Sequence, residues 1–121
     1  MRLTITQLAK SCGLSRSTLL YYDRIGLLRA TDRTGSGYRL YGAAERKRLQ
    51  RICALRQAGL ALADIRTMLA GARKPRATVV ARRLEEIGGQ VRDLRVKQRL
   101  LAGMLDKLAR GAVPPQVDKA L

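Results

Sequence analysis

Hydrophobic residues near the start of the chain recur with the period of an α-helix. Four of them stand at i, i+3, i+4 and i+7 and form one apolar stripe: Ile5, Leu8, Ala9 and Cys12. Thr4 and Gln7 have the spacing of a capping box, which predicts that the helix begins at Thr4. Gly13 then ends this helix, because glycine readily takes the conformation that follows a last turn.

A second short helix is predicted over residues 16–25, with Ser15 as its N-cap and Gly26 after its last turn. Two short helices joined by residues 13–15 are typical of a helix-turn-helix motif.

The second helix has two different faces. Helical spacing turns Leu19 and Tyr22 inward, toward the first helix. The opposite face mixes hydroxyl, guanidinium and apolar groups, from Arg16, Ser17, Leu20, Tyr21 and Arg24. Such a face suits contact with bases and sugars. The alternative is that Leu20 or Tyr21 closes the core from the side.

A β-hairpin is predicted after the helix-turn-helix. Its extended segments are residues 27–29 and 38–41, and the turn lies within residues 32–37, which are rich in glycine. Alternation along the second segment places Arg39 and Tyr41 on one face and the even-numbered residues on the other. A hairpin in this place is typical of a wing that lies over a phosphate backbone. The alternative is an ordinary hairpin that covers the core.

Two more helices should complete the first part of the chain. One begins after Gly42 and is anchored by Leu49, Ile52 and Leu55. The next is short and carries four apolar residues: Leu62, Ile65, Met68 and Leu69. The composition agrees with a mainly α fold, because a core without Phe or Trp is built from aliphatic side chains, which helices pack well.

A boundary is predicted at residues 71–75, where a helix-ending Gly71 precedes a helix-blocking Pro75. We therefore expect a compact unit over residues 1–70, a long helix over residues 76–110 and an irregular tail over residues 111–121.

The long helix has the most regular apolar pattern in the chain. Spacings of three and four alternate along ten positions: Ala77, Val80, Leu84, Ile87, Val91, Leu94, Gln98, Leu101, Leu105 and Leu108. We call this heptad stripe the seam. It is too long for a 70-residue unit to cover, so we expect the residues from Val80 to Leu108 to pair two copies into a homodimer. The alternative is a helix that lies on its own domain.

Charge points to a polyanionic partner. The chain has 25 Lys and Arg against 9 Asp and Glu, for a net charge of +16. Nucleic acid is the first candidate and an anionic membrane surface the second. Arginine greatly outnumbers lysine, which favours DNA because a guanidinium group can donate two parallel hydrogen bonds to a phosphate or a guanine.

Candidate chemistry is sparse. The sequence has no His, and no nucleophile–base pair, phosphate loop or metal constellation is recognisable, so we expect neither an enzyme nor a cofactor. Cys12 and Cys53 match no zinc or redox spacing and are expected to stay reduced. Sensing of redox state or electrophiles by either thiol is the alternative. Without a signal peptide or a membrane-spanning stretch, a cytoplasmic location is expected.

Several segments together resemble the mercury-resistance-regulator (MerR) family of transcription regulators. The resemblance covers residues 2–70 without a gap. It is carried by TQLA at 6–9, GLS at 13–15, TLLYYDRIGLL at 18–28, GYRLY at 37–41 and AGLALADI at 58–65, together with Arg33, Arg48, Leu49, Ile52 and Leu69.

The resemblance implies a winged helix-turn-helix followed by an antiparallel coiled coil between two subunits. It implies binding to a pseudo-palindromic promoter operator, with bending and untwisting of the DNA that lets RNA polymerase engage both promoter elements. The residues implied to face the major groove are Arg16, Ser17, Thr18, Tyr21 and Arg24. Those implied to hold the DNA backbone are Arg33, Tyr38, Arg39 and Tyr41.

Two departures from the family pattern bear on function. Leu20 stands where the family usually has an arginine, which removes a charged contact. We expect neither the large domain of drug-sensing members, since only residues 111–121 follow the predicted coiled coil here, nor a metal site of metal-sensing members, since no cysteine follows Cys53, so no effector is supported. An architectural DNA-bending protein of the excisionase type, without an effector, is the alternative function.

Overall fold

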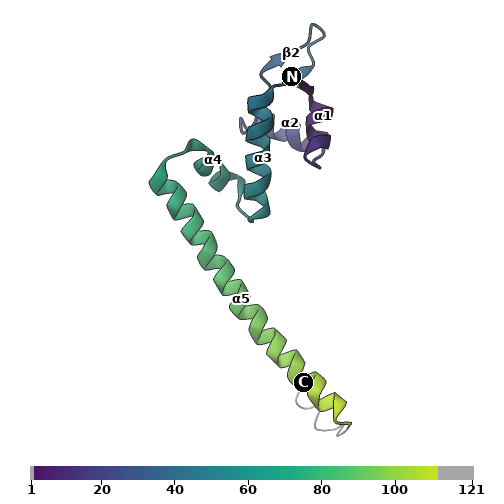
Figure 1. Ribbon diagram of the computed structural model, residues 1–121, viewed down its shortest axis with the longest axis vertical. Helices are drawn as coiled ribbons and strands as arrows, with labels where there is room; N and C mark the ends of the chain where they lie inside the picture. Colours follow the sequence, from purple (N-terminus) through teal and green to yellow (C-terminus); the bar gives the residue numbers. More distant parts are fainter. Residues whose placement is uncertain (1, 112–121) are drawn as a thin grey trace. The chain divides into compact units, whose positions relative to one another are not determined.

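The computed structural model describes residues 2–111 and is mainly helical, with one small sheet (Figure 1). Its elements, in chain order, are β1 (Leu3–Thr4), α1 (Ile5–Ser11), α2 (Arg16–Arg24), β2 (Asp32–Arg33), β3 (Arg39–Tyr41), α3 (Ala43–Gln57), α4 (Leu62–Ala70) and α5 (Arg73–Ala109). The chain divides into two compact units between Val79 and Val80. The predicted fold, a winged helix-turn-helix followed by a long helix, is confirmed.

The caps of the first two helices are those that the sequence predicts. Thr4 Oγ1 accepts a hydrogen bond from the Gln7 amide at 3.2 Å, and Gln7 Oε1 accepts one from the Thr4 amide at 2.9 Å. Ser15 Oγ accepts from the Thr18 amide at 3.1 Å and starts α2. Gly26, with φ of 73°, follows α2 in the left-handed conformation.

The sheet has the order β1-β3-β2 and is antiparallel on both sides of β3. The hairpin prediction is confirmed, but its first strand is residues 32–33 and not 27–29. Leu27 and Leu28 are both 1% exposed. Two consecutive buried side chains suit a loop that folds into the core better than a strand, whose side chains alternate between faces.

The core of the first unit draws on the helices, β3 and the loop after α2. Leu19 and Tyr22 of α2 are buried, as predicted. The buried hydrophobic residues are Ile5, Leu8, Ala9, Leu19, Tyr22, Leu27, Leu28, Tyr41, Leu49, Ile52, Leu60, Ile65 and Val79. Most are aliphatic, and the remaining aromatic rings of the unit lie at its surface.

The boundary between α4 and α5 differs from the prediction at one residue. Gly71 has φ of 85° and caps α4, as predicted. Pro75, however, does not block the next helix, because α5 already begins at Arg73 and includes Pro75 in its first turn. A proline is tolerated there, since the first backbone N–H groups of a helix have no partner within it. Of the predicted tail, only Gly111 lies within the described residues.

The hydroxyl of Tyr41 is buried and has no hydrogen-bond partner among the described residues. Burial, which is the main cause, and the nearby Asp23 carboxylate raise the pKa of Tyr41.

Removing the unpaired, buried hydroxyl of Tyr41 relieves its desolvation cost. We expect Tyr41→Phe to raise the free energy of unfolding by about 1 kcal/mol in urea denaturation. Tyr38→Phe, at a side chain that is 68% exposed, is the control and should change nothing. A destabilised Tyr41→Phe protein would show that the hydroxyl is bonded.

Candidate nucleic-acid interface

A cleft of about 310 Å³ lies between the helix-turn-helix and the wing, the hairpin of β2 and β3. Its lining residues come from the start of α1, the start of α2 and the end of the wing turn: Thr4, Ile5, Thr6, Arg16, Gly37, Tyr38 and Arg39. This lining, among the described residues, includes two arginines and no carboxylate. The cleft is therefore a basic, hydroxyl-bearing surface of the kind that accepts a phosphate backbone.

The outer face of α2 is exposed as predicted at four positions. Arg16, Ser17 and Arg24 are exposed, and Tyr21 is 43% exposed. The Arg24 guanidinium lies over the Tyr21 ring, 5.9 Å from its centroid. This cation–π contact places the guanidinium and the aromatic ring on the same side of the helix, one turn beyond Ser17.

Two neighbouring residues of α2 lie partly inside. Leu20 is half-buried and packs against the core, so the alternative considered for it, closing the core from the side, describes its position. Thr18 is also half-buried, and its hydroxyl lies 2.8 Å from Ser15 Oγ. The helix therefore presents a narrower outer face than the sequence suggested.

The base of the wing is tied to the start of α3. The Gly42 amide donates to Glu45 Oε1 at 2.9 Å and to Thr31 Oγ1 at 3.3 Å, and the Thr31 hydroxyl also donates to Glu45. The hydrogen bond from Thr31 is the main reason that the pKa of Glu45 is lowered. The carboxylate thus holds the chain entering β2 against the chain leaving β3.

The turn of the wing is closed by its own hydrogen bonds. The Thr34 amide donates to the Tyr38 carbonyl at 2.8 Å, and Arg33 Nη1 donates to the Gly37 carbonyl at 2.8 Å. Gly37 has φ of 86°, a conformation that favours glycine. Arg33 and Tyr38 are both exposed at this turn, where the prediction places them against a DNA backbone.

Arg39 joins the wing to α2. Its Nε lies 2.9 Å from Asp23 Oδ2, and the two side chains are 30% and 20% exposed. A partly buried ion pair of this kind restrains both side chains more firmly than an exposed pair would. The pair fixes the orientation of the wing relative to α2.

Tyr41 does not lie at the surface. Its side chain is 0% exposed, so the predicted contact with the DNA backbone is wrong for this residue. The predicted alternation in β3 is sound, but the face that carries Arg39 and Tyr41 is turned toward α2 and the core. We therefore leave Tyr41 out of the interface.

Two arginines that the sequence did not single out for a role secure the end of α2. Arg48 Nε, in α3, donates a hydrogen bond to the Leu27 carbonyl oxygen at 2.8 Å. Arg66, in α4, donates to the Ile25 carbonyl. Both carbonyls follow the last turn of α2, where backbone acceptors lack partners within the helix. The signal available in the sequence was the two consecutive leucines, Leu27 and Leu28, because adjacent apolar residues in a loop indicate that the loop turns toward the core.

Tyr21→Ala is expected to weaken DNA binding about tenfold, the size of a lost base contact, with a change in stability below about 1 kcal/mol. The reason is that the ring stands outside the core. Fluorescence anisotropy and thermal unfolding measure the two effects. Tyr22→Ala is the matched control: its ring is 5% exposed, and its loss should cost about 3–5 kcal/mol. A large drop in the stability of Tyr21→Ala would show that our face assignment is rotated.

Arg39→Ala is expected to weaken binding to all DNA sequences alike and to lower the salt dependence by about one charge per subunit, because we place at phosphate the end of the guanidinium that the bond from Nε to Asp23 does not use. Titrations with several operator variants at different salt concentrations check this. Arg95→Ala removes the same charge from an exposed site on α5 and should have little effect. A loss confined to one base position would instead make Arg39 a base reader.

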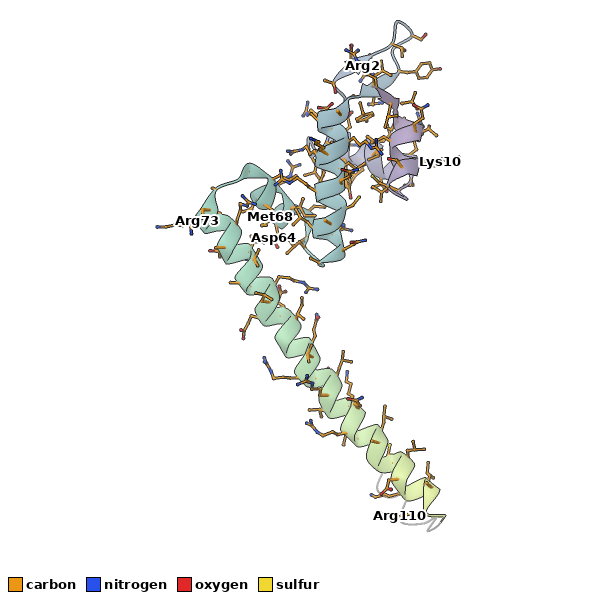
Figure 2. The ribbon with its side chains drawn as sticks, viewed as in Figure 1. Arg2, Lys10, Asp64, Met68, Arg73 and Arg110 are labelled. Carbon is orange, nitrogen blue, oxygen red and sulfur yellow. The ribbon has the colours of Figure 1, made fainter. Side chains whose placement is uncertain are left out.

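Side chains project from α5 along its length (Figure 2), and those of the seam are exposed in the single chain. Leu84, Leu101 and Leu105 are 65%, 65% and 68% exposed. The predicted dimerisation residues are all solvent-accessible: Val80, Leu84, Ile87, Val91, Leu94, Gln98, Leu101, Leu105 and Leu108. So many large aliphatic side chains along one stripe form an apolar surface that a soluble monomer rarely leaves uncovered.

The chain matches the models of a known protein family over most of its length. Residues 3–72 match the model of the MerR HTH family regulatory proteins, and residues 46–109 match the model described as MerR, DNA binding. The chain belongs to the MerR family. It is a DNA-binding transcription regulator of that family, and the resemblance found in the sequence is confirmed.

Individual relatives cover most of this MerR-family chain. The mercuric resistance operon regulatory protein of Bacillus cereus is 29% identical, over 88% of this chain and 86% of its own length. The crystal structure of MtaN, the N-terminus of the Bacillus subtilis multidrug transporter activator, is 29% identical with a TM-score of 0.71, over 85% of this chain and 97% of its own. A cryo-EM structure of an EcmrR–DNA complex is 29% identical with a TM-score of 0.67, over 83% of this chain and 39% of its own.

The relatives also bear on what the MerR-family chain does not do. They are transcription regulators and not enzymes, which agrees with the sequence analysis. The chain spans less than half the length of some relatives, among them the nodulation protein NolA of Bradyrhizobium diazoefficiens, of which it covers 47%. Within residues 2–111, no helix is long and apolar enough to cross a membrane.

Proposed function

We propose that this MerR-family regulator binds a pseudo-palindromic promoter operator as a homodimer and acts by bending and untwisting the DNA. The observation that carries the proposal is the basic cleft between α2 and the wing, with Arg16 and Arg39 on its walls. The exposed seam on α5 supports the dimer. An operator with two similar halves is what a two-fold symmetric protein requires.

Each part of the interface has a separate role in the proposal. The outer face of α2 enters the major groove with Arg16, Ser17, Tyr21 and Arg24, and Thr18 stands at the edge of this face. Arg33, Tyr38 and Arg39 of the wing hold the phosphate backbone. In this arrangement α2 contacts the bases, and the wing positions the protein on the DNA backbone.

The dimer forms in this proposal by antiparallel pairing of the seam. From Ala77 to Leu108 the seam is about 48 Å long at 1.5 Å per residue. Antiparallel pairing sends the two DNA-binding units to opposite ends, as successive half-sites require. Gly88, Gly89 and Gly103 each weaken the helix by about 1 kcal/mol relative to alanine, so its stability depends on this pairing.

RNA polymerase is the further partner in this proposal. One relative, EcmrR, was solved as a DNA complex within an assembly named EcmrR-RPo. When a bound dimer bends and untwists the promoter DNA, it changes how RNA polymerase reaches the promoter elements. The described residues include no cluster of metal ligands that would indicate an effector, and we assign none.

Selection of bound fragments from a pool of genomic DNA, followed by footprinting, tests the proposal. We expect a protected site with two similar halves about one or two helical turns apart, and transcription in vitro that depends on that promoter. Arg16→Ala should abolish the footprint at concentrations where Arg95→Ala retains it. Uniform protection of all DNA, with no effect on transcription, would contradict the proposal and favour an architectural DNA-bending protein.

A further inference from the structure

The two cysteines of the chain meet in the fold, although they are far apart in sequence. Cys12 is the C-cap of α1, and Cys53 lies in α3. Both side chains are free and partly exposed. They line the same cavity of about 420 Å³, together with Tyr22 of α2 and Arg56 of α3. Sequence spacing gave no sign of this pair, because the two residues come together only where both pack against the common core.

Both side chains pack against the core of the first unit from the same cavity. Burial is the main cause that raises the pKa of Cys53, and the adjacent Cys12 thiol raises it further. Neither cysteine belongs to the cleft proposed for DNA. The pair therefore stands apart from the proposed function, and its chemistry can be tested without an operator.

We propose that Cys12 and Cys53 form a dithiol modification site, which a small anionic disulfide such as glutathione disulfide converts into an intramolecular disulfide. The cavity admits the reagent to both sulfurs. Arg56, which is exposed on its wall, attracts the carboxylates of the reagent, and the net charge of +16 raises the local concentration of any anion.

The reaction takes place in two exchange steps. One protein thiolate attacks a sulfur of glutathione disulfide, so that a mixed disulfide forms and one glutathione leaves as a thiolate. The second protein thiolate then attacks the protein sulfur of the mixed disulfide, and the second glutathione leaves. Both leaving groups take up the protons that the cysteines lost. In sum, two protein thiols are oxidised, and one glutathione disulfide is reduced to two glutathiones.

The product closes a covalent loop around α2 and the wing. This loop runs from the end of α1 to the middle of α3 and contains all of α2. Linking these positions restricts the unfolded chain, so the oxidised protein should unfold at a higher temperature than the reduced one.

The test incubates the full-length chain with glutathione disulfide in mildly alkaline buffer, because the thiolate is the attacking form. We expect the intact protein to lose two hydrogens in mass, to lose both free thiols together and to remain one chain in non-reducing electrophoresis. Trypsin should release residues 11–16 linked to residues 52–56. Reduced glutathione should reverse these changes.

Cys12→Ser and Cys53→Ser are the matched controls, and each should instead keep one glutathione adduct. Should either variant fail to fold by circular dichroism, the linked tryptic peptide of the wild-type chain still decides the matter. Persistent double glutathione adducts, disulfides between chains, or two unchanged thiols at equilibrium would each overturn the proposal.

Discussion

Raising the salt concentration from about 50 to about 200 mM is expected to weaken operator binding by about a thousandfold or more. Each phosphate that a protein cation neutralises releases condensed counterions, and added salt opposes this release. With basic groups from both subunits, the proposed dimer neutralises roughly 6–10 phosphates. A plot of log affinity against log salt should therefore have a slope of about −5 to −9. Fluorescence anisotropy with a labelled operator measures it.

Charge-matched variants show where the salt dependence arises. Arg33→Ala, in the wing, should make the slope shallower by about two per dimer, because each subunit loses one phosphate contact. Arg95→Ala changes the net charge equally and should leave the slope almost unchanged. A nearly flat titration for the wild-type protein would contradict the electrostatic interface altogether.

Leu94→Glu is expected to convert the dimer into monomers that bind the operator weakly. Leu94 lies near the middle of the seam, where antiparallel pairing would bury both introduced carboxylates close together, at a cost of several kcal/mol. Sedimentation equilibrium measures the association. Val96→Glu is the matched control, because Val96 is also exposed, at 45%, but stands outside the seam. Dissociation by both variants, or by neither, would contradict the assigned seam.

Engineered cysteines decide the orientation of the two helices. In a background with Cys12 and Cys53 replaced by serine, Leu94→Cys should cross-link readily within an antiparallel dimer. Leu108→Cys should not, since its two thiols would lie at opposite ends of the seam. Efficient cross-linking of Leu108→Cys would falsify the antiparallel model and point to a parallel pair.

Local signals in the sequence predicted most of the fold. Thr4, Gln7 and Ser15 were recognised as helix caps because capping depends on hydrogen bonds between residues three apart. The short strands were harder: β1 and β2 have two residues each, too few to show alternation. They exist because β3 pairs with both, and that pairing depends on residues distant in sequence.

The candidate interface was predictable where helical periodicity determines exposure, as at Ser17 and Tyr21. It was not predictable where packing between elements decides. Tyr41 was expected at DNA by resemblance, and alternation alone does not say which face of a strand is covered. Arg48 and Arg66 donate hydrogen bonds to carbonyls of the loop at the end of α2, and Cys12 and Cys53 line one cavity although 41 positions separate them in the sequence. Their long-range contacts leave no local pattern.

The distribution of buried residues in α2 bears on how the protein evolves. Within its nine residues, all of them described, the buried ones are Leu19 and Tyr22. The cap at Ser15 and the bonds from Arg48 and Arg66 hold the helix from its two ends. Selection on folding therefore acts mainly on the inner positions of the helix, and its outer positions answer to DNA binding instead. Regulator and operator can diverge together by single substitutions at these positions. Each substitution changes the stability of the fold too little for selection to remove it.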